Sequence, residues 1–190
     1  MTTRFTKVGA SIIAATIALG APAFAQNTMV GGAEMFPNRN IVENAVNSAD
    51  HTTLVAAVQA AGLVETLSGP GPFTVFAPTN AAFEKLPDGT VEGLLEPESL
   101  QTLQTILTCH VVPTEAMSSA VGRMIQQGGG SAALETVGGC TLTASIRASD
   151  NALQITDENG NVATVLIPDV DQSNGVIHVI DDVLLPAPPT

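Results

Sequence analysis

The sequence predicts an α+β fold with a largely antiparallel sheet. Apolar residues recur at helical spacing in the first half of the chain, and from Leu134 onward every apolar segment has the length of a strand. The two patterns are segregated along the chain, which argues against a parallel sheet built from strand–helix–strand repeats. With 190 residues and no internal repeat or linker, the chain is expected to form one domain.

The composition narrows the class of partner before any motif is considered. Eighteen Asp and Glu against six Lys and Arg give a net charge of −12, and aromatic residues make up 3% of the chain. A nucleic-acid partner is not expected, because binding needs basic groups for the phosphates and aromatic rings for the bases. An anionic membrane face is disfavoured by the same charge. The apolar content of 45% argues against intrinsic disorder.

Residues 1–25 have the pattern of a cleaved signal peptide. Arg4 and Lys7 precede the apolar stretch 8–20, and Ala-Phe-Ala at 23–25 supplies a small-x-small cleavage site. The alternative is a transmembrane anchor, but about 13 residues span roughly 20 Å, short of a hydrocarbon core of about 30 Å. We therefore expect export to the periplasm, the cell surface or the medium, with no stable membrane insertion after cleavage. Loss of the two basic residues takes the net charge from −12 to −14.

Cys109 and Cys140 are the two cysteines of the chain. Export would place them in an oxidising compartment, so a disulfide between them is predicted. On the chain-entropy model, closing this loop stabilises the fold by about 3–4 kcal/mol. The alternative is a pair of buried free thiols whose Cα atoms lie too far apart to be joined.

The domain is expected over residues 40–185, after an extended lead-in at 26–39 and before a proline-rich tail at 186–190. Its first helix should begin at Asn40, because Glu43 follows at the spacing of a capping box. Helices are predicted over 41–46, 52–61, 91–95, 97–107 and 116–127, with a short one after Thr79.

Strands are predicted over 73–77, 109–112, 142–147, 152–156, 162–167 and 176–180. Alternation in the first of them places Phe73, Val75 and Ala77 on one face. Residues 157–160 (Asp-Glu-Asn-Gly) carry the Asn-Gly signal of a hairpin turn, and 169–175 is expected to be a polar loop.

Three segments resemble the signatures of the fasciclin (FAS1) domain family. GPFTVFAPTNAAF at 71–83 looks like its first signature, CHVVP at 109–113 its central Tyr-His segment, and NGVIHVID at 174–181 its second signature. The resemblance implies a β-wedge of mainly antiparallel strands packed with a helical layer. It also implies an exported, non-catalytic binding module for cell adhesion, whose partner is a surface or matrix protein or polysaccharide. One position departs from the pattern, because Cys109 stands where the family often has Tyr.

Most of the signature residues are expected to build the interior. Phe73, Phe76 and Phe83 are interpreted as core anchors, and His178 as a buried, hydrogen-bonded imidazole. The signature residues with a mainly structural role are Phe73, Thr74, Val75, Phe76, Ala77, Pro78, Thr79, Asn80, Phe83, His110, Asn174, Gly175, His178 and Asp181.

A candidate contact rim is transferred from the family's central segment to His110, Val111, Val112, Pro113 and Thr114. For His110 two interpretations stay open, since a helix C-terminus favours its charged form and an apolar strand the neutral form. His51, near a helix start, is expected to be solvated.

The sequence carries no recognisable motif for catalysis, cofactor binding or metal binding. The Gly-x-Ser-x-Gly pattern fails at 129–133, which lacks the second Gly. Phosphate-binding and dinucleotide-binding glycine motifs are absent, as are paired Cys for zinc. The acidic loop at 169–175 lacks the Gly and Glu of a calcium-binding loop. We therefore predict no catalytic residue, cofactor or metal. Two alternatives remain: a carrier of a small apolar ligand held between sheet and helices, and a hydrolase that uses His110 or His178.

Overall fold

The computed structural model describes residues 27–87 and 89–187, and the predicted signal peptide lies outside this part of the chain. Its sheet strands are β3 (Phe73–Pro78), β4 (Val111–Val112), β5 (Ser131–Glu135), β6 (Thr141–Ile146), β7 (Leu153–Thr156), β8 (Val162–Gln172) and β9 (Gly175–Ile180). Its helices are α1 (Ile41–Ala45), α2 (Thr52–Ala60), α3 (Val64–Ser68), α4 (Asn80–Phe83), α5 (Thr90–Leu94), α6 (Leu100–Cys109) and α7 (Ser118–Gln127), with short 3₁₀ turns at Ala49–His51 and Pro97–Ser99.

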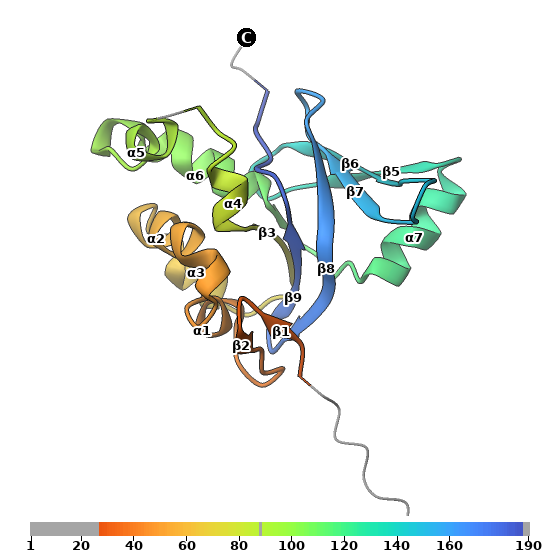
Figure 1. Ribbon diagram of the computed structural model, residues 1–190, viewed down its shortest axis with the longest axis horizontal. Coiled ribbons are helices and arrows are strands. Elements are labelled where there is room, and N and C mark those ends of the chain that lie inside the picture. The colour runs from red at the N-terminus through yellow and green to blue at the C-terminus, as the bar shows by residue number, and fades with distance from the viewer. Residues whose placement is uncertain (1–26, 88, 188–190) are drawn as a thin grey trace, which may run out of the picture.

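The seven strands form one sheet in the order β4-β3-β9-β8-β7-β6-β5. All neighbours are antiparallel except β3 and β9, which run parallel in a continuous register. β8 pairs with β7 through its first residues and with β9 through the rest, with two register shifts between Val165 and Val170. These irregularities bend β8 and separate the sheet into the two halves of a wedge (Figure 1). The predicted α+β wedge of mainly antiparallel strands is confirmed.

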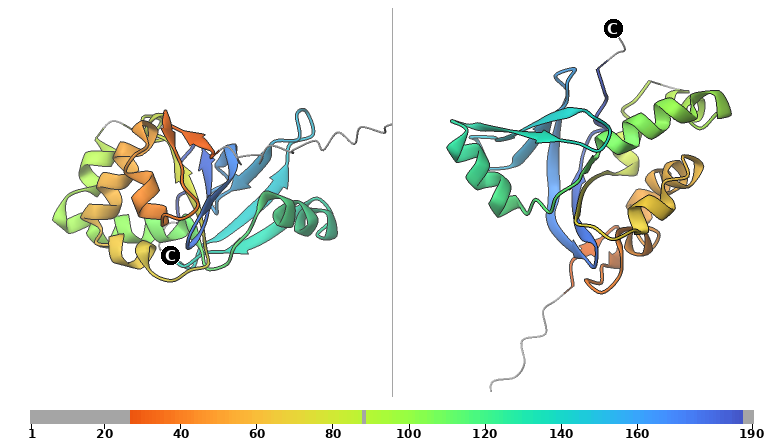
Figure 2. Two further views of the ribbon diagram at one scale, coloured as in Figure 1. Left: turned by 90° about the horizontal axis from the view of Figure 1, so that it is seen from below. Right: turned by 180° about the vertical axis from the view of Figure 1, so that it is seen from behind.

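Helices cover the wedge on both sides. Figure 1 shows α1 to α6 on one side of β3 and β9, and α7 on the other side near β5, β6 and β7; Figure 2 shows the same division from behind. Successive side chains of β3 point to opposite faces of the sheet, so this strand contributes to a core on each side. Phe73, Val75 and Ala77 face the core under α1, α2 and α6, as the sequence predicts, while Phe76 faces a second core between the two halves of the sheet and α7.

Local signals set several element boundaries as predicted. Asn40 and Glu43 form a reciprocal capping box at α1, with both hydrogen bonds at 2.9 Å. Thr79 caps α4 by accepting the Ala82 N–H at 3.3 Å. Gly62, with φ of +69°, follows the end of α2, where the left-handed conformation favours glycine. The turn at 157–160 joins β7 and β8 in a hairpin, as expected.

Two predicted elements are wrong in their bounds. The strand expected over 109–112 begins only at Val111, because the buried stripe of α6 continues through Leu107 to Cys109. The polar loop expected over 169–175 is mostly strand, because Val170 and Gln172 point inward and extend β8. In addition, α3 and β5 had no separate prediction.

The segment before α1 packs against the domain. It forms a small hairpin of β1 (Met29–Val30) and β2 (Ala33–Glu34), and Met35 joins the first core. The buried side chain of Asn44 fixes the segment by accepting the Phe36 N–H at 3.0 Å and donating to the Phe36 carbonyl at 2.8 Å.

The start of the β3–β9 pair requires glycine. Gly175 has φ of +153°, and a Cβ there would lie 2.0 Å from the backbone oxygen of Phe73. Replacing Gly175 with Ala should therefore lower the free energy of unfolding by about 2–4 kcal/mol, through backbone strain and displacement of β3.

Urea denaturation followed by circular dichroism measures this difference. Gly122→Ala is the matched control, because Gly122 lies within α7 and a Cβ added there would meet nothing within 4 Å. Its free energy of unfolding should stay constant or rise by about 0.5–1 kcal/mol. Equal stability of the two variants would contradict the proposed close approach.

Candidate functional site

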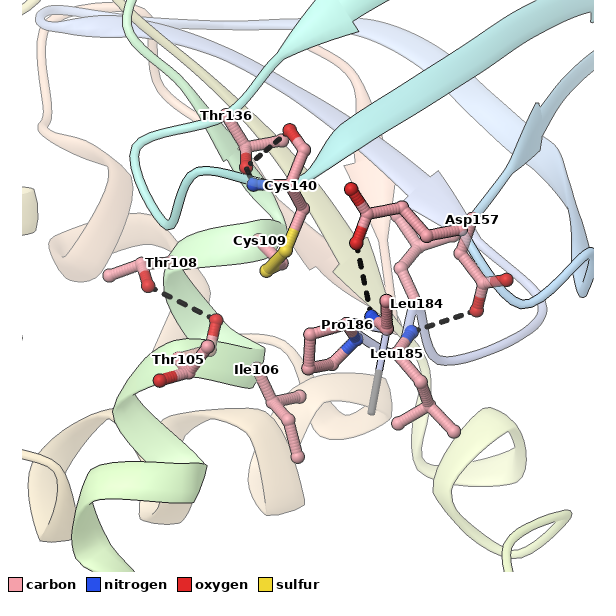
Figure 3. The surroundings of a disulfide bond; sticks show 12 residues. Thr105, Ile106, Thr108, Cys109, Thr136, Cys140, Asp157, Leu184, Leu185 and Pro186 are labelled. Atoms are coloured by element: carbon pink, nitrogen blue, oxygen red, sulfur yellow. Dashed lines mark hydrogen bonds between the residues drawn. A yellow bond between two sulfur atoms is a disulfide. The ribbon is translucent and has the colours of Figure 1, made fainter. Parts of the chain in front are cut away.

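A disulfide closes the end of α6 against the turn between β5 and β6. Cys109 and Cys140 are joined in the structure, and their Cα atoms lie 5.4 Å apart, within the range that a disulfide needs (Figure 3). Two backbone hydrogen bonds support the bridge: Val137 N–H donates to the Val111 carbonyl at 2.7 Å, and Gly138 N–H to the Thr108 carbonyl at 3.0 Å. The turn is thereby fixed beside β4.

His110 lies inside the protein next to this bridge. Its side chain is 2% exposed. Nδ1 lies 2.8 Å from the Ile106 carbonyl, and Nε2 accepts the Leu184 N–H at 2.9 Å, which assigns the ring proton to Nδ1. Burial lowers the pKa of His110 to about 4, so the imidazole is neutral near pH 7. Of the two interpretations left open by the sequence, the burial of the ring and its hydrogen bonds favour the neutral form.

His178 connects β9 with the segment that leads to α7. Its ring is fully buried beside Phe76, at 5.6 Å between ring centroids. Nδ1 accepts the Asp169 N–H at 3.2 Å, and Nε2–H donates to the Ala116 carbonyl at 2.8 Å. Burial lowers the pKa of His178, consistent with a neutral ring that has both nitrogens occupied.

Thr74 and Asp169 hold the same segment. The Thr74 hydroxyl donates to the Thr114 carbonyl at 2.6 Å and accepts the Ala116 N–H at 2.7 Å. The Asp169 carboxylate accepts the backbone N–H of Ser118 at 2.6 Å and also its hydroxyl, at the start of α7. Side chains of β3, β8 and β9 therefore position the chain that follows β4.

Two asparagine side chains of the signatures join separate elements: Asn174 links the β8–β9 turn to helices α1 and α3, and Asn80 links α4 to the start of α2. Asn174 accepts the Ile41 N–H at 3.0 Å and donates to the carbonyls of Leu67 and Gly69 at 2.8 and 2.9 Å. Asn80 accepts the Thr53 N–H at 3.0 Å and donates to the Ala49 carbonyl at 2.9 Å. These amide groups therefore hold elements of the fold together.

Asp181 likewise serves the backbone, since its carboxylate accepts the Thr164 N–H at 2.6 Å. Phe76 and Phe83 are buried, at 0% and 8% exposure, whereas Phe73 is half-buried.

The five residues of the candidate contact rim divide into two groups. His110, Val111 and Val112 are buried, and Pro113 and Thr114 are exposed. Pairing of β4 with β3 and the hydrogen bond from Val137 bury the first group. Only the end of this segment can therefore touch a partner in this conformation.

An apolar surface lies beside the exposed end of the rim. Val137 is 47% exposed and, with half-buried Leu63 and Phe73, borders a hollow of about 30 Å³. Pro113 follows Val112, which pairs with Thr74 next to Phe73. We name Leu63, Phe73 and Val137, which line the same hollow, the Val137 patch. The sequence signal for this surface is an apolar residue, Val137, in a turn that contains glycine. That this turn lies next to α3 could not be predicted from the sequence.

The apolar interior between the sheet and the helices offers little room for a ligand, whereas a partly polar hollow of about 340 Å³ opens between α2, α4 and α5. Two apolar cavities between α1, α2 and β3 measure about 40 and 30 Å³. A cavity of about 150 Å³ accepts benzene, so these hold at most a few water-sized molecules. Among the described residues, no group of three His, Cys, Asp or Glu is arranged to hold a metal ion.

The prediction that His51 is solvated is wrong. The ring is 3% exposed at the smaller cavity, and its Nδ1 lies 2.8 Å from the Ser48 hydroxyl. Burial lowers the pKa of His51, partly offset by the nearby Ala77 carbonyl and the charge of Asp50. Nε2 makes no hydrogen bond within the described part of the chain, so the Ala77 carbonyl acts on it without bonding geometry.

The fold and this site together define a β-wedge domain whose polar signature residues are occupied internally. The family model of the fasciclin domain matches residues 49–186. This chain therefore belongs to the fasciclin domain family. Across residues 27–87 and 89–187, no helix has both the length and the apolarity needed to span a bilayer.

Related proteins come from bacteria and animals. The Synechocystis protein sll1483 is 45% identical, and the match covers 95% of this chain and 98% of that protein. Transforming growth factor-beta-induced protein ig-h3 of Sus scrofa is 38% identical over 70% of this chain, but only 17% of ig-h3 is covered. Cell surface glycolipoprotein MPB83 of Mycobacterium bovis is 38% identical, with 65% of this chain and 48% of MPB83 covered.

A solved structure shares the fold. The FAS1 domain pair of the insect cell adhesion molecule fasciclin I matches with a TM-score of 0.68 and 21% identity, over 77% of this chain and 51% of that one.

Loss of the Thr74 hydroxyl should destabilise the fold. Thr74→Val keeps the shape of the side chain but leaves the Ala116 N–H and the Thr114 carbonyl without this partner. We expect a decrease of about 1–3 kcal/mol in the free energy of unfolding, measured by urea denaturation. Thr143→Val on β6 is the control, because Thr143 is exposed and makes no side-chain hydrogen bond to another described residue. A decrease of the same size in both variants would contradict this role.

Proposed function

We propose that this protein is an exported, non-catalytic binding module that mediates adhesion through contacts with a cell-surface, matrix or biofilm partner. The observation that carries the proposal is the contrast between interior and surface. The polar signature side chains bond the backbone internally, while the central segment reaches the surface beside the Val137 patch. An apolar side chain held on a fixed turn can contact another protein with little loss of conformational entropy.

The burial and hydrogen bonding of the histidines support a non-catalytic role. A general base needs an accessible nitrogen near a substrate, whereas His110 and His178 are buried with both ring nitrogens engaged. The small size of the apolar cavities argues against a small apolar ligand held between the sheet and the helices.

The relatives support the class of function. Fasciclin I is named an insect cell adhesion molecule, and MPB83 a cell surface glycolipoprotein. With the signal-peptide pattern at 1–25 and the disulfide, these names favour a mature domain over 40–185 outside the cytoplasm.

A cellular assay tests first whether the protein mediates adhesion and then which part of its surface is responsible. Deletion of the gene should reduce surface attachment or aggregation of the cells, and the wild-type gene should restore it. Attachment unchanged by deletion under several growth conditions would contradict the adhesive function.

Val137→Glu should fail to restore attachment, because a carboxylate at the centre of the Val137 patch opposes apolar contact. Val162→Glu is the matched control, since Val162 on β8 is 45% exposed against 47% for Val137. The control should restore attachment fully, and thermal unfolding should confirm that both variants fold. If Val137→Glu restores attachment as well as the control does, the contact lies on another face.

A further inference from the structure

Residues 184–187, named here the C-terminal strap, are held by side chains and not by strand pairing. Leu184 N–H donates to His110 Nε2 at 2.9 Å, Leu185 N–H to Asp157 at 2.9 Å, and Ala187 N–H to Glu158 at 3.0 Å. Pro186 has no N–H to donate. Every backbone donor of the strap is therefore accepted by a titratable side chain.

A neutral side chain completes the attachment. Asn159 Nδ2 donates to the carbonyls of Leu185 and Pro186, each at 3.0 Å. Asp157, Glu158 and Asn159 all belong to the β7–β8 turn, so one turn grips the strap while His110 holds it from the end of α6.

The strap lies beside the disulfide. Figure 3 shows Leu184, Leu185 and Pro186 alongside the bridge between Cys109 and Cys140. The two cysteines are 1% and 4% exposed, and Leu184 is 1% exposed within the second core. Attack on a disulfide requires access to a sulfur atom, so the burial of the two cysteines limits reduction.

We propose that the C-terminal strap is an acid-released cover over the Cys109–Cys140 disulfide. Protonation turns the accepting nitrogen of His110 into a donor, which opposes the Leu184 N–H. Asp157 accepts N–H groups at both oxygens, from the turn and from Leu185, and so ties the strap to the β7–β8 turn. Protonation of Glu158 weakens its acceptance of the Ala187 N–H.

The direction of the pH effect follows from the two states of the strap. Burial holds the pKa of His110 at about 4 when the strap is closed, against an ordinary value of 6.5. An opened strap lets water reach the ring, so the open form binds a proton more readily between those values. Acidification through this window therefore favours opening, by at most roughly 300-fold for a change of about 2.5 pKa units.

Glu158 adds to the effect at lower pH. Hydrogen bonds from Thr141 and Ala187 lower its pKa below 4.5 in the closed form, so the closed form loses stability as the pH falls through that region.

The charged neighbours of these groups do not reverse the direction. The negative charge of Asp157 raises the pKa of both His110 and Glu158. The effect of burial is larger for His110, and the effect of the hydrogen bonds from Thr141 and Ala187 is larger for Glu158, so both pKa values are still lowered. Lys85 of the segment after α4 pairs with Asp182, before the strap, and makes no bond to the three acceptors.

The test is the rate of disulfide reduction by the phosphine TCEP, which attacks one sulfur and is oxidised to the phosphine oxide with water as both thiols form. The protein recovered from cells that export it is treated at pH 7, 5.5 and 4.5, with oxidised glutathione as the reference for the reagent's own pH dependence. The rate relative to glutathione should rise at least tenfold from pH 7 to 4.5, while circular dichroism shows an intact fold.

Two variants separate the strap from general effects. Asn159→Ala removes both neutral bonds and should accelerate reduction several-fold already at pH 7. Asn38→Ala is the control, because Asn38 is exposed and makes no bond to the strap, and it should not accelerate reduction.

Glu158→Gln keeps an oxygen for Ala187 but does not titrate, so its rate should rise less between pH 5.5 and 4.5. Glu135→Gln on β5 makes the same charge change and should behave as wild type.

Three results would overturn the proposal. The first is a relative rate that stays constant from pH 7 to 4.5 while the fold is intact. The second is acceleration that occurs only together with loss of the circular dichroism signal, which is global unfolding. The third is an Asn159→Ala protein that folds and is reduced at the wild-type rate.

Discussion

The close parallel contact between β3 and β9 is the constraint on which the rest of the structure depends. It brings together two segments about a hundred residues apart, and it needs glycine on both sides: a Cβ at Gly71 would lie 1.9 Å from the Asn174 oxygen, and one at Gly175 would lie 2.0 Å from that of Phe73. Once the strands meet, Asn174 reaches α1 and α3, and His178 reaches the segment before α7. The helical layer and the wedge are therefore attached to a single pair of strands.

The polar side chains at this junction bind backbone groups of the protein itself. A buried polar group must be hydrogen-bonded, and here the available partners are backbone groups of irregular segments. Thr74, His178 and Asp169 satisfy the chain between β4 and α7, which has few sheet partners of its own. Because their hydrogen-bonding capacity is used for this purpose, we assign the proposed binding function to the surface.

The sequence was sufficient to predict the features that depend on residues close together in the chain. The capping box at Asn40, the alternation of Phe73 to Ala77, and the cysteine pair each depend on a few neighbouring residues or on a pairing with no competitor. The failures lie where distant segments decide. β8 continues through 169–172 because β9 pairs with it, and His51 is buried because α1 and β3 close around it. The contact rim shows the same limit, since only the pairing of β4 determines that Val111 and Val112 point inward.

The disulfide links the proposed contact surface to the strap. Val137 lies in the turn that ends at Cys140, and its own N–H bonds the carbonyl of Val111, two residues after Cys109. The bridge and this bond together hold the Val137 patch against β4. The strap is attached through side chains and not through a strand ladder, so it can open without loss of the sheet. A reductant that reaches the opened bridge would therefore loosen the turn that presents Val137, while the β3–β9 junction and the helical layer stay in place.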